Sequence, residues 1–263
     1  MLKIEADDSS VNSPWLISKY ISSWDRTASD ITDTVVIADN RLDAIERIKY
    51  KKSIVWLTSS PAYRSDLRPD YHWCKYDKIL TFDRRILEAH SHAHLFPLGG
   101  SWLRSTDICI GVKDKLVSSI HSRKNKSPNQ VLRLKIADDL KYCIDNFGPV
   151  ANNQIRYKAD ALQPYAFSLA VENCCQDYYF SEKLTDCFAT GTIPIYYGCP
   201  SIGKFFNLDG MIIIRSYEHA IEIIPTLTFK HYYDRIEAVK DNYTRVLQYL
   251  IPEDYGMSNN LFQ

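Results

Sequence analysis

The sequence has no excess of either charge, no long apolar run and no paired cysteine motif. Lysine plus arginine number 32 and aspartate plus glutamate also number 32, so the formal net charge is zero. A chain that neutralises many phosphates is usually basic, so this balance argues against nucleic acid as the main partner. No stretch approaches the roughly 20 apolar residues that cross a bilayer, and we expect no transmembrane segment.

Several short motifs are also missing. The N-terminal MLKIEADDSS has acids where a signal peptide would be apolar. The seven cysteines are an odd number without a C-x-x-C pair, so we predict reduced thiols and a cytoplasmic protein. The lack of G-x-G-x-x-G and of G-x-x-x-x-G-K-[ST] disfavours an ordinary dinucleotide site and a P-loop. We also find no internal repeat.

Short apolar runs alternate with segments of helical periodicity, which predicts an α/β fold. In the first half the expected strands are 34–38, 54–58, 78–82 and 94–100, with helices across 41–49 and 84–91. In the second half the expected strands are 115–120, 166–172, 192–198 and 211–215, with helices across 129–146, 181–190, 217–224 and 230–250. The polar stretch before 115 predicts a domain boundary near residue 113.

Two predicted helix starts in the second half carry basic residues. Ser127 and Pro128 are suited to the N-cap and first position of one helix, which carries Arg133. Lys183 lies in the first turn of another, after the strand 166–172. Ligands bind at the carboxyl ends of strands in open α/β sheets, and helix N-termini attract phosphate. A diphosphate cradle is therefore predicted there, although each residue alone could be an ordinary solvated side chain.

The segment 164–207, PYAFSLAVENCCQDYYFSEKLTDCFATGTIPIYYGCPSIGKFFN, resembles the donor-binding signature of the α-1,3-fucosyltransferases, glycosyltransferase family 10. The shared order is a buried strand ending in Glu-Asn, a tyrosine-bearing loop, a Glu-Lys helix start and a strand with proline. KLVSSIHS with RLKIADDL, and more weakly YDKILTFDRRI, also resemble this family. The chain is more similar to bacterial or viral members than to Golgi ones.

The resemblance implies a GT-B fold, in which two Rossmann-like domains face each other across a cleft. Residues 1–113 would form the acceptor-side domain, and 114–263 the donor-binding domain, with a C-terminal helix that crosses back. It further implies an inverting glycosyltransferase that moves fucose or a related sugar from a nucleotide-diphosphate donor to a glycan hydroxyl. The donor is a substrate, and neither a metal nor another cofactor is expected.

Five residues of this sequence match the family's donor-binding positions. Arg133 and Lys183 match those that grip the donor diphosphate, and Glu182 matches a carboxylate that contacts ribose or sugar hydroxyls. Asn173 and Tyr179 match residues that line the nucleotide site.

Glu172, just before Asn173, is a secondary candidate that we expect to order the loop.

The catalytic base is where this sequence departs from the family. The fucosyltransferases use a glutamate after a strand of the acceptor domain, but SSPAYRSDLRPD, which follows 54–58, contains none. Asp66 and Asp70 are the nearest acids and our candidates for the base, although each could be a plain loop residue. Asp7 and Asp8 are weaker candidates.

The departure keeps two alternatives open: the same fold using a UDP-linked pentose or hexose such as xylose, and a non-catalytic protein that binds a nucleotide-sugar or a glycan.

Two further groups in the first half have several interpretations. His90, His92 and His94 alternate, so they could ligate a metal, form a polar wall of the acceptor cleft or lie on the surface. No acidic or cysteine partner is evident, and we predict no metal site. Aromatic residues, Trp102 among them, could offer a platform for an acceptor sugar or pack in the core and loops.

Overall fold

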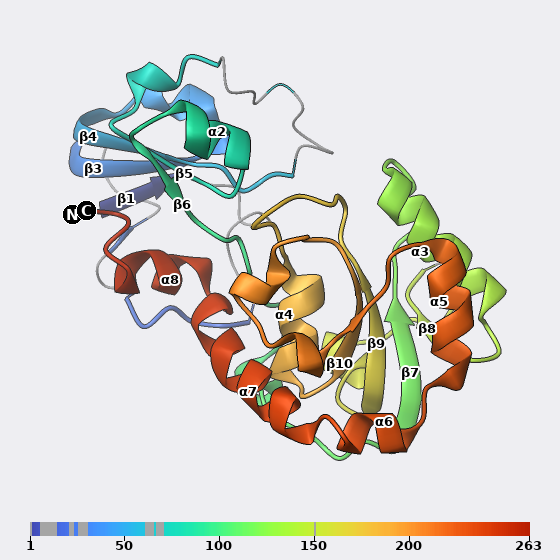
Figure 1. Cartoon of the computed structure of the whole chain (residues 1–263). Coiled ribbons are helices and arrows are strands. Elements are labelled where there is room, and N and C mark those ends of the chain that lie inside the picture. The colour runs from blue at the N-terminus through green and yellow to red at the C-terminus, as the bar shows by residue number, and fades with distance from the viewer. Residues whose placement is uncertain are drawn as a thin grey trace.

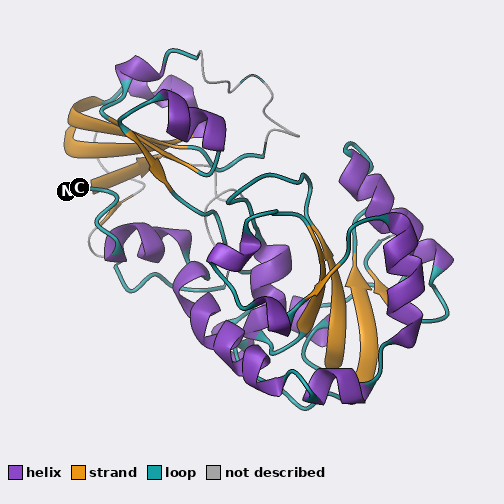
Figure 2. Ribbon diagram, in the orientation of Figure 1, coloured by secondary structure: helices purple, strands orange, loops and turns teal. Residues whose placement is uncertain are grey.

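The fold consists of two parallel β-sheets flanked by helices, as Figures 1 and 2 show for this computed structural model. The structure describes residues 2–5, 15–20, 24–25, 31–60, 66, 71–149 and 151–263. Within these ranges the first half of the chain forms one sheet and the second half forms the other. The predicted α/β architecture with two Rossmann-like sheets is confirmed.

The first sheet has the strand order β2-β1-β3-β4-β5-β6, and all its pairs are parallel. Its strands are β1 (Leu2–Glu5), β2 (Trp24–Asp25), β3 (Ile31–Ala38), β4 (Lys49–Trp56), β5 (Lys78–Thr81) and β6 (Ala93–Leu95). A 3₁₀ segment, η2 (Asp39–Glu46), follows β3, and α2 (Arg84–Ala89) follows β5.

Alternating side chains of the central strands bury both faces of this sheet. Val35 and Ile37 of β3 pack in one apolar cluster with Ile86 of α2. Val36 of the same strand packs in a second cluster on the opposite face, together with Phe262 near the C-terminus. Because successive strand residues point to opposite faces, this continuous apolar run is what a sheet covered on both sides requires.

The second sheet has the order β11-β10-β9-β7-β8 and is also entirely parallel. Its strands are β7 (Lys115–Ile120), β8 (Asp145–Phe147), β9 (Tyr165–Val171), β10 (Ile193–Tyr197) and β11 (Ile212–Ile213). The helices are α3 (Pro128–Asp139), α4 (Glu182–Ala189), α5 (Tyr217–Ile223), α6 (Phe229–Tyr233), α7 (Ile236–Val246) and α8 (Pro252–Ser258).

The C-terminal segment returns to the first sheet. After α7 and α8 the chain places Phe262 against Trp56 and Phe96, with ring centroids 5.8 and 6.1 Å apart. The Lys78 ammonium donates hydrogen bonds to the carbonyls of Leu261 and Gln263, at 3.0 and 2.6 Å. Leu2 of β1 packs against the same apolar cluster as Phe262, and Figure 1 shows the C-terminal end of the chain beside β1. The last residues, which follow the helices of the second half of the chain, therefore pack on the first sheet and link the two halves.

The helix predicted across 41–49 is a 3₁₀ segment that ends at Glu46, and the strand predicted at 54–58 begins at Lys49.

Three further predicted elements differ from the structure. The helix expected across 129–146 ends at Asp139 and β8 follows it, and the Asn146 amide donates to the Ala137 carbonyl, one of those that a helix end leaves without an intrahelical partner. The strand expected at 94–100 ends at Leu95, and Pro97, which has no N–H to donate to a neighbouring strand, follows shortly after it. The long helix expected at 230–250 is divided between α6, α7 and a 3₁₀ turn.

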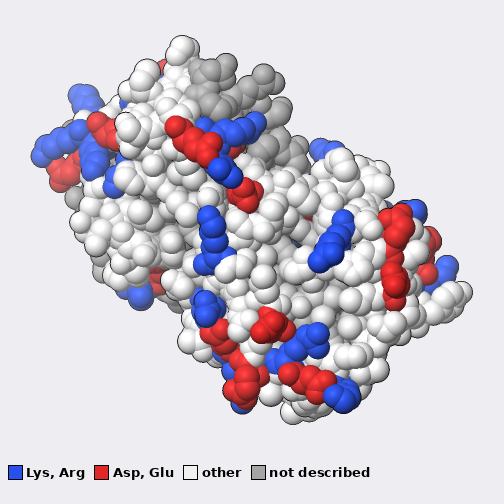
Figure 3. Space-filling model, viewed as in Figure 1, with Lys and Arg blue, Asp and Glu red and all other residues white. Residues whose placement is uncertain are grey.

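None of the helices in the described ranges combines the length and the apolar composition that crossing a bilayer requires. On the face in Figure 3, basic and acidic side chains lie in small mixed groups with wide uncharged areas between them. The mixed charges on this face agree with the zero net charge of the chain.

We expect Phe262→Ala to destabilise the protein by about 3–5 kcal/mol, because it removes a buried ring that packs on the first sheet. Urea unfolding followed by circular dichroism measures this loss. Tyr142→Ala, which removes a ring that is 91% exposed, is the control and should change stability little. A loss below 1 kcal/mol for Phe262→Ala would show that the C-terminal segment does not hold the first sheet.

Candidate nucleotide-binding site

A cavity of about 710 Å³ lies at the carboxyl ends of β7, β8 and β9, where ligands bind in open α/β sheets. All five residues predicted to contact the donor line it: Arg133, Asn173, Tyr179, Glu182 and Lys183. Further lining residues include Leu98, Trp102, His121, Lys124, Gln130, Pro149, Ile155, Lys158 and Ser181. The sequence prediction therefore selected side chains that the fold gathers around one space.

The start of α4 is held by the end of β9. Glu172 directly follows β9 and is fully buried. Its carboxylate accepts hydrogen bonds from the backbone N–H and the hydroxyl of Ser181, at 2.8 and 2.7 Å. Ser181 is the N-cap of α4. Glu172 does not line the cavity but fixes the helix that does, and its pKa is raised because burial disfavours the charge more than Lys183 favours it.

A glycine makes room for this buried carboxylate. A Cβ atom added to Gly198, which follows β10, would lie 2.6 Å from Cγ of Glu172 and 2.6 Å from the hydroxyl of Tyr196. Both contacts are too short for any side chain, so the strand end can approach Glu172 only at a glycine.

Glu182 and Lys183 form a charged pair on the first turn of α4. The Lys183 ammonium lies 3.1 Å from a Glu182 carboxylate oxygen and 3.9 Å from Glu172. Burial opposes the charge on each, but the two carboxylates still raise the pKa of Lys183. Despite burial, Lys183 and Lys158 lower the pKa of Glu182 to about 2. Both side chains are therefore ionised at neutral pH, and both retain some exposure to the cavity.

The start of α3 supplies the second basic residue. Ser127 caps the helix by accepting from the Gln130 N–H, and Pro128 occupies the first position, as predicted. The buried Gln130 amide also donates to the side-chain oxygen of Asn173, at 3.2 Å, and so joins α3 to the end of β9. Arg133 follows in the next turn with only 5% of its surface exposed.

Arg133 lies near Lys183 in this arrangement. Its positive charge disfavours the protonated form of Lys183, which lowers the pKa of that residue against the effect of the two carboxylates. It also lowers the pKa of His121, although burial lowers that pKa more. Two like charges converge on the cavity from two helix starts. Such convergence is costly without a ligand and favourable for an anion with more than one charge.

Tyr179 joins the site to the first sheet. Only 3% of its surface is accessible. Its ring centroid lies 5.0 Å from that of Phe82, the residue that directly follows β5. Nearby, the Arg84 guanidinium lies 3.6 Å from the Asp177 carboxylate. The loop between β9 and α4 thus contacts the first sheet and lines the cavity.

Sequence reasoning missed Lys158. This residue begins a 3₁₀ turn far from the motif, and no local pattern marks it. Its ammonium lies 2.7 Å from the buried Asp186 carboxylate of α4 and donates to the Glu182 carbonyl at 2.9 Å. Lys158 is therefore a further cation on the cavity, in addition to Lys124, Arg133 and Lys183, and its position depends on contacts that only the fold creates.

Of the two predicted bases, the structure describes only Asp66. Asp66 is an exposed turn residue and is not among the residues that line the cavity. Asp70, like Asp7 and Asp8, lies outside the described residues. The described Asp39, at the end of β3, is buried and accepts hydrogen bonds from the Thr58 hydroxyl and the Ser59 N–H, both at 2.8 Å.

In the part of the chain that the structure describes, no three histidine, cysteine, aspartate or glutamate residues are grouped to hold a metal ion. Of the three alternating histidines, His90 and His92 have ring centroids 5.6 Å apart, and His94 is exposed on β6.

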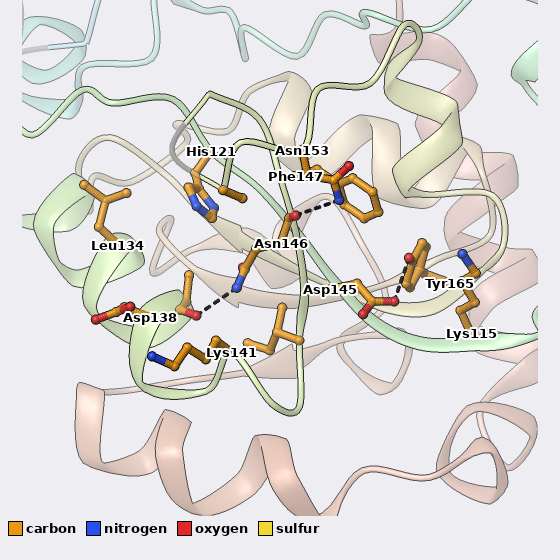
Figure 4. Close-up of a pocket in the computed structure, with 13 residues that line it drawn as sticks. Lys115, His121, Leu134, Asp138, Lys141, Asp145, Asn146, Phe147, Asn153 and Tyr165 are labelled. Carbon is orange, nitrogen blue, oxygen red and sulfur yellow. Dashed lines mark hydrogen bonds between the residues drawn. The ribbon is translucent and has the colours of Figure 1, made fainter.

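A second cavity, of about 690 Å³, runs along β8 and α3 and contains none of the predicted site residues (Figure 4). Within it the Tyr165 hydroxyl donates to Asp145, and the Asn153 amide donates to the Asn146 carbonyl. Its two lysines share the lining with two aspartates, whereas in the first cavity four lysine and arginine side chains share the lining with the single acid Glu182. The first cavity therefore has the excess of positive charge that a diphosphate requires and is the better candidate site.

Comparison with known proteins finds relatives of the second half of the chain. Residues 110–250 match the model of glycosyltransferase family 10 (fucosyltransferase), C-terminal part. The Helicobacter pylori alpha-(1,3)-fucosyltransferase FucT is 29% identical over 133 residues, which is 48% of this chain and 28% of that protein. The chain spans about a third or less of the length of the curated relatives it matches.

Solved structures extend the similarity in fold to nearly the whole chain. A crystal structure of an alpha1,3-fucosyltransferase has a TM-score of 0.59 and 17% identity, covering 92% of this chain and 80% of that one. A crystal structure of alpha1,3-fucosyltransferase with GDP has a TM-score of 0.56 and 16% identity, covering 94% and 88%.

We expect Lys158→Met to raise the pKa of Glu182 from about 2 toward the ordinary 4.5, because one of the two cations that stabilise its charge is lost. Since the folded-state pKa is lowered, the stabilisation by Glu182 is complete above pH 4.5 and disappears as the pH falls through about 2. NMR titration of ¹³C-labelled glutamate carboxyls between pH 3 and 6 should show Glu182 titrating only in the variant. Lys141→Met, at the second cavity, is the control. Identical curves for Glu182 would contradict the proposed role of Lys158.

Proposed function

The chain belongs to glycosyltransferase family 10, the fucosyltransferase family, and on this premise we propose that it transfers fucose or a related sugar from a nucleotide-diphosphate donor to a hydroxyl of a glycan. The observation that carries the proposal is the convergence of Arg133 and Lys183, from the starts of two helices, on one cavity at the carboxyl edge of a sheet.

We assign the donor diphosphate to Arg133, Lys183 and the N-terminal turn of α4. Glu182 accepts hydrogen bonds from ribose or sugar hydroxyls, and its low pKa keeps it an acceptor at neutral pH. Asn173 and Tyr179 line the nucleotide. Glu172 acts through Ser181, whose position it fixes, and does not touch the donor.

The proposed reaction is a single displacement that inverts the anomeric carbon. The acceptor oxygen forms a bond to that carbon while the bond to the diphosphate breaks, and the leaving group gains negative charge. Fixed cations directed at this developing charge lower the barrier. Arg133 and Lys183 are placed for this task, so the proposed mechanism requires no metal ion.

The acceptor hydroxyl must also lose a proton, and a positioned carboxylate accelerates such a step by about 10²–10⁴-fold. Asp66 and Asp70 remain the predicted bases. We also propose the division into an acceptor-side domain, 1–113, and a donor domain, 114–263. The strands of the two sheets, which end at Leu95 and begin at Lys115, support it.

For the donor, GDP-fucose is our first choice, because a structure of similar fold was determined with GDP. A UDP-linked pentose or hexose such as xylose is the alternative on the same fold. A non-catalytic nucleotide-sugar or glycan-binding protein is the second alternative. It is favoured by one observation, that the described acid at the end of β3, Asp39, is buried and bonded within its own domain.

The cellular setting stays a prediction. The seven cysteines are all free thiols, which are typical of reducing compartments and support the proposed cytoplasmic location.

A donor panel tests the assignment of substrate. With GDP-fucose, other GDP-sugars and UDP-sugars including xylose, we expect GDP-fucose to be consumed fastest, with GDP released. Calorimetry with GDP and UDP beside this assay separates binding from turnover. Nucleotide binding without turnover of any donor would contradict the enzyme proposal and favour the binding protein.

We expect Lys183→Ala to reduce transfer at least 10²-fold, because the leaving diphosphate loses a fixed cation. Initial rates at saturating acceptor measure the effect. Lys204→Ala is the matched control, since Lys204 is a lysine in a nearby 3₁₀ turn that does not line the cavity. Equal melting temperatures would show that both variants keep the fold. Activity within threefold of the wild type would overturn the proposed site.

A further inference from the structure

The segment between β6 and β7, which joins the two sheets, is hydrogen-bonded to α4 and to the residues just before it. The Gly99 N–H donates to the Phe180 carbonyl at 3.2 Å, and the Thr185 hydroxyl donates to the Gly100 carbonyl. Gly99 has a φ of +60°, and a Cβ atom there would lie 2.5 Å from the Tyr249 carbonyl oxygen. Glycine therefore lets the segment pass close enough to bring Ser101 and Trp102 onto the helix.

A buried carboxylate of α4 holds the next two residues. Asp186 is fully buried and accepts hydrogen bonds from the Ser101 hydroxyl at 2.6 Å and the Trp102 N–H at 3.1 Å. The Lys158 ammonium, 2.7 Å away, completes this set. Because a buried carboxylate is stable only when hydrogen bonds surround it, Asp186 fixes the backbone of Trp102 and the side chain of Lys158 relative to each other.

The Trp102 side chain is exposed on the cavity wall. Trp56 and Trp73 are buried, with 1% and 0% accessibility, whereas Trp15 and Trp102 are 52% and 54% exposed, and of these two it is Trp102 that lines the cavity with the cations. Its ring lies 6.0 Å from the Lys158 ammonium. Leu98, Pro149 and Ile155 add apolar surface to the same cavity. A flat aromatic face on a cavity wall, carried by a backbone that Asp186 holds, is suited to a flat ligand group.

We propose that Trp102 stacks on the nucleobase of the donor. This inference rests on the proposed function, because it assigns one part of the same nucleotide. Lys158 donates to the carbonyl of Glu182, the residue assigned to hydroxyls such as those of ribose, and Trp102 lies beside Lys158. The group attached to ribose on the side away from the diphosphate is the base. The charged part of the cavity thus takes the diphosphate, and Trp102 with its apolar neighbours takes the base.

Calorimetry with two ligands tests this assignment: GDP, and ribose 5-diphosphate, which lacks only the base. Base stacking on an aromatic side chain contributes about 1–3 kcal/mol, so Trp102→Ala should weaken GDP binding about 5- to 150-fold. Its affinity for ribose 5-diphosphate should stay within twofold of the wild type. Trp102→Phe keeps an aromatic face and should retain most of the GDP affinity.

The alternatives give different results. Unchanged GDP affinity in Trp102→Ala would overturn the inference and leave Trp102 as a surface for an acceptor sugar. An equal loss for both ligands would also overturn it, because the effect would then come from a disturbed diphosphate site. A wild-type chain that binds neither ligand would instead contradict the proposed function, which separates the two failures.

Discussion

Glu172 ends β9 with a fully buried carboxylate, and Ser181 donates to it from both its backbone and its hydroxyl. A buried carboxylate without such partners would cost several kcal/mol, so the first turn of α4 can occupy only a narrow range of positions. Lys183 and Glu182 project from that turn, and Asn173 follows Glu172 directly. The geometry of the site therefore depends on this contact between a strand end and a helix cap.

A second buried carboxylate, that of Asp186 in α4, also fixes the groups that donate hydrogen bonds to it. Asp186 holds Lys158 and the segment between the two sheets, as Glu172 holds Ser181. The two acids lie behind the cavity, and the cations that they orient face it. This arrangement keeps positive groups in place before a ligand arrives, which is what stabilising a departing diphosphate requires. It also explains how an electrically neutral chain can contain a local anion site.

The donor half of the site was predictable because its signals are local. Ser127 and Pro128 mark a helix start in any context, and Glu-Asn before a Glu-Lys helix start is continuous in sequence. Lys158 and Trp102 were not assigned to a nucleotide, since they come together only in the folded chain, around Asp186, which is 84 positions from Trp102. β8 was missed because Leu140 and Ile144 continue the apolar spacing of α3 beyond its end and pack in the same cluster. On the acceptor side the sequence contains acidic residues, but no motif shows which of them the fold places at the site.

A crystal structure of the chain soaked with GDP tests the central claim most directly. The account predicts the diphosphate within hydrogen-bond distance of both Arg133 and Lys183, at the start of α4, with the base directed toward Trp102. GDP bound at the cavity along β8 and α3, or a diphosphate that touches neither cation, would contradict it.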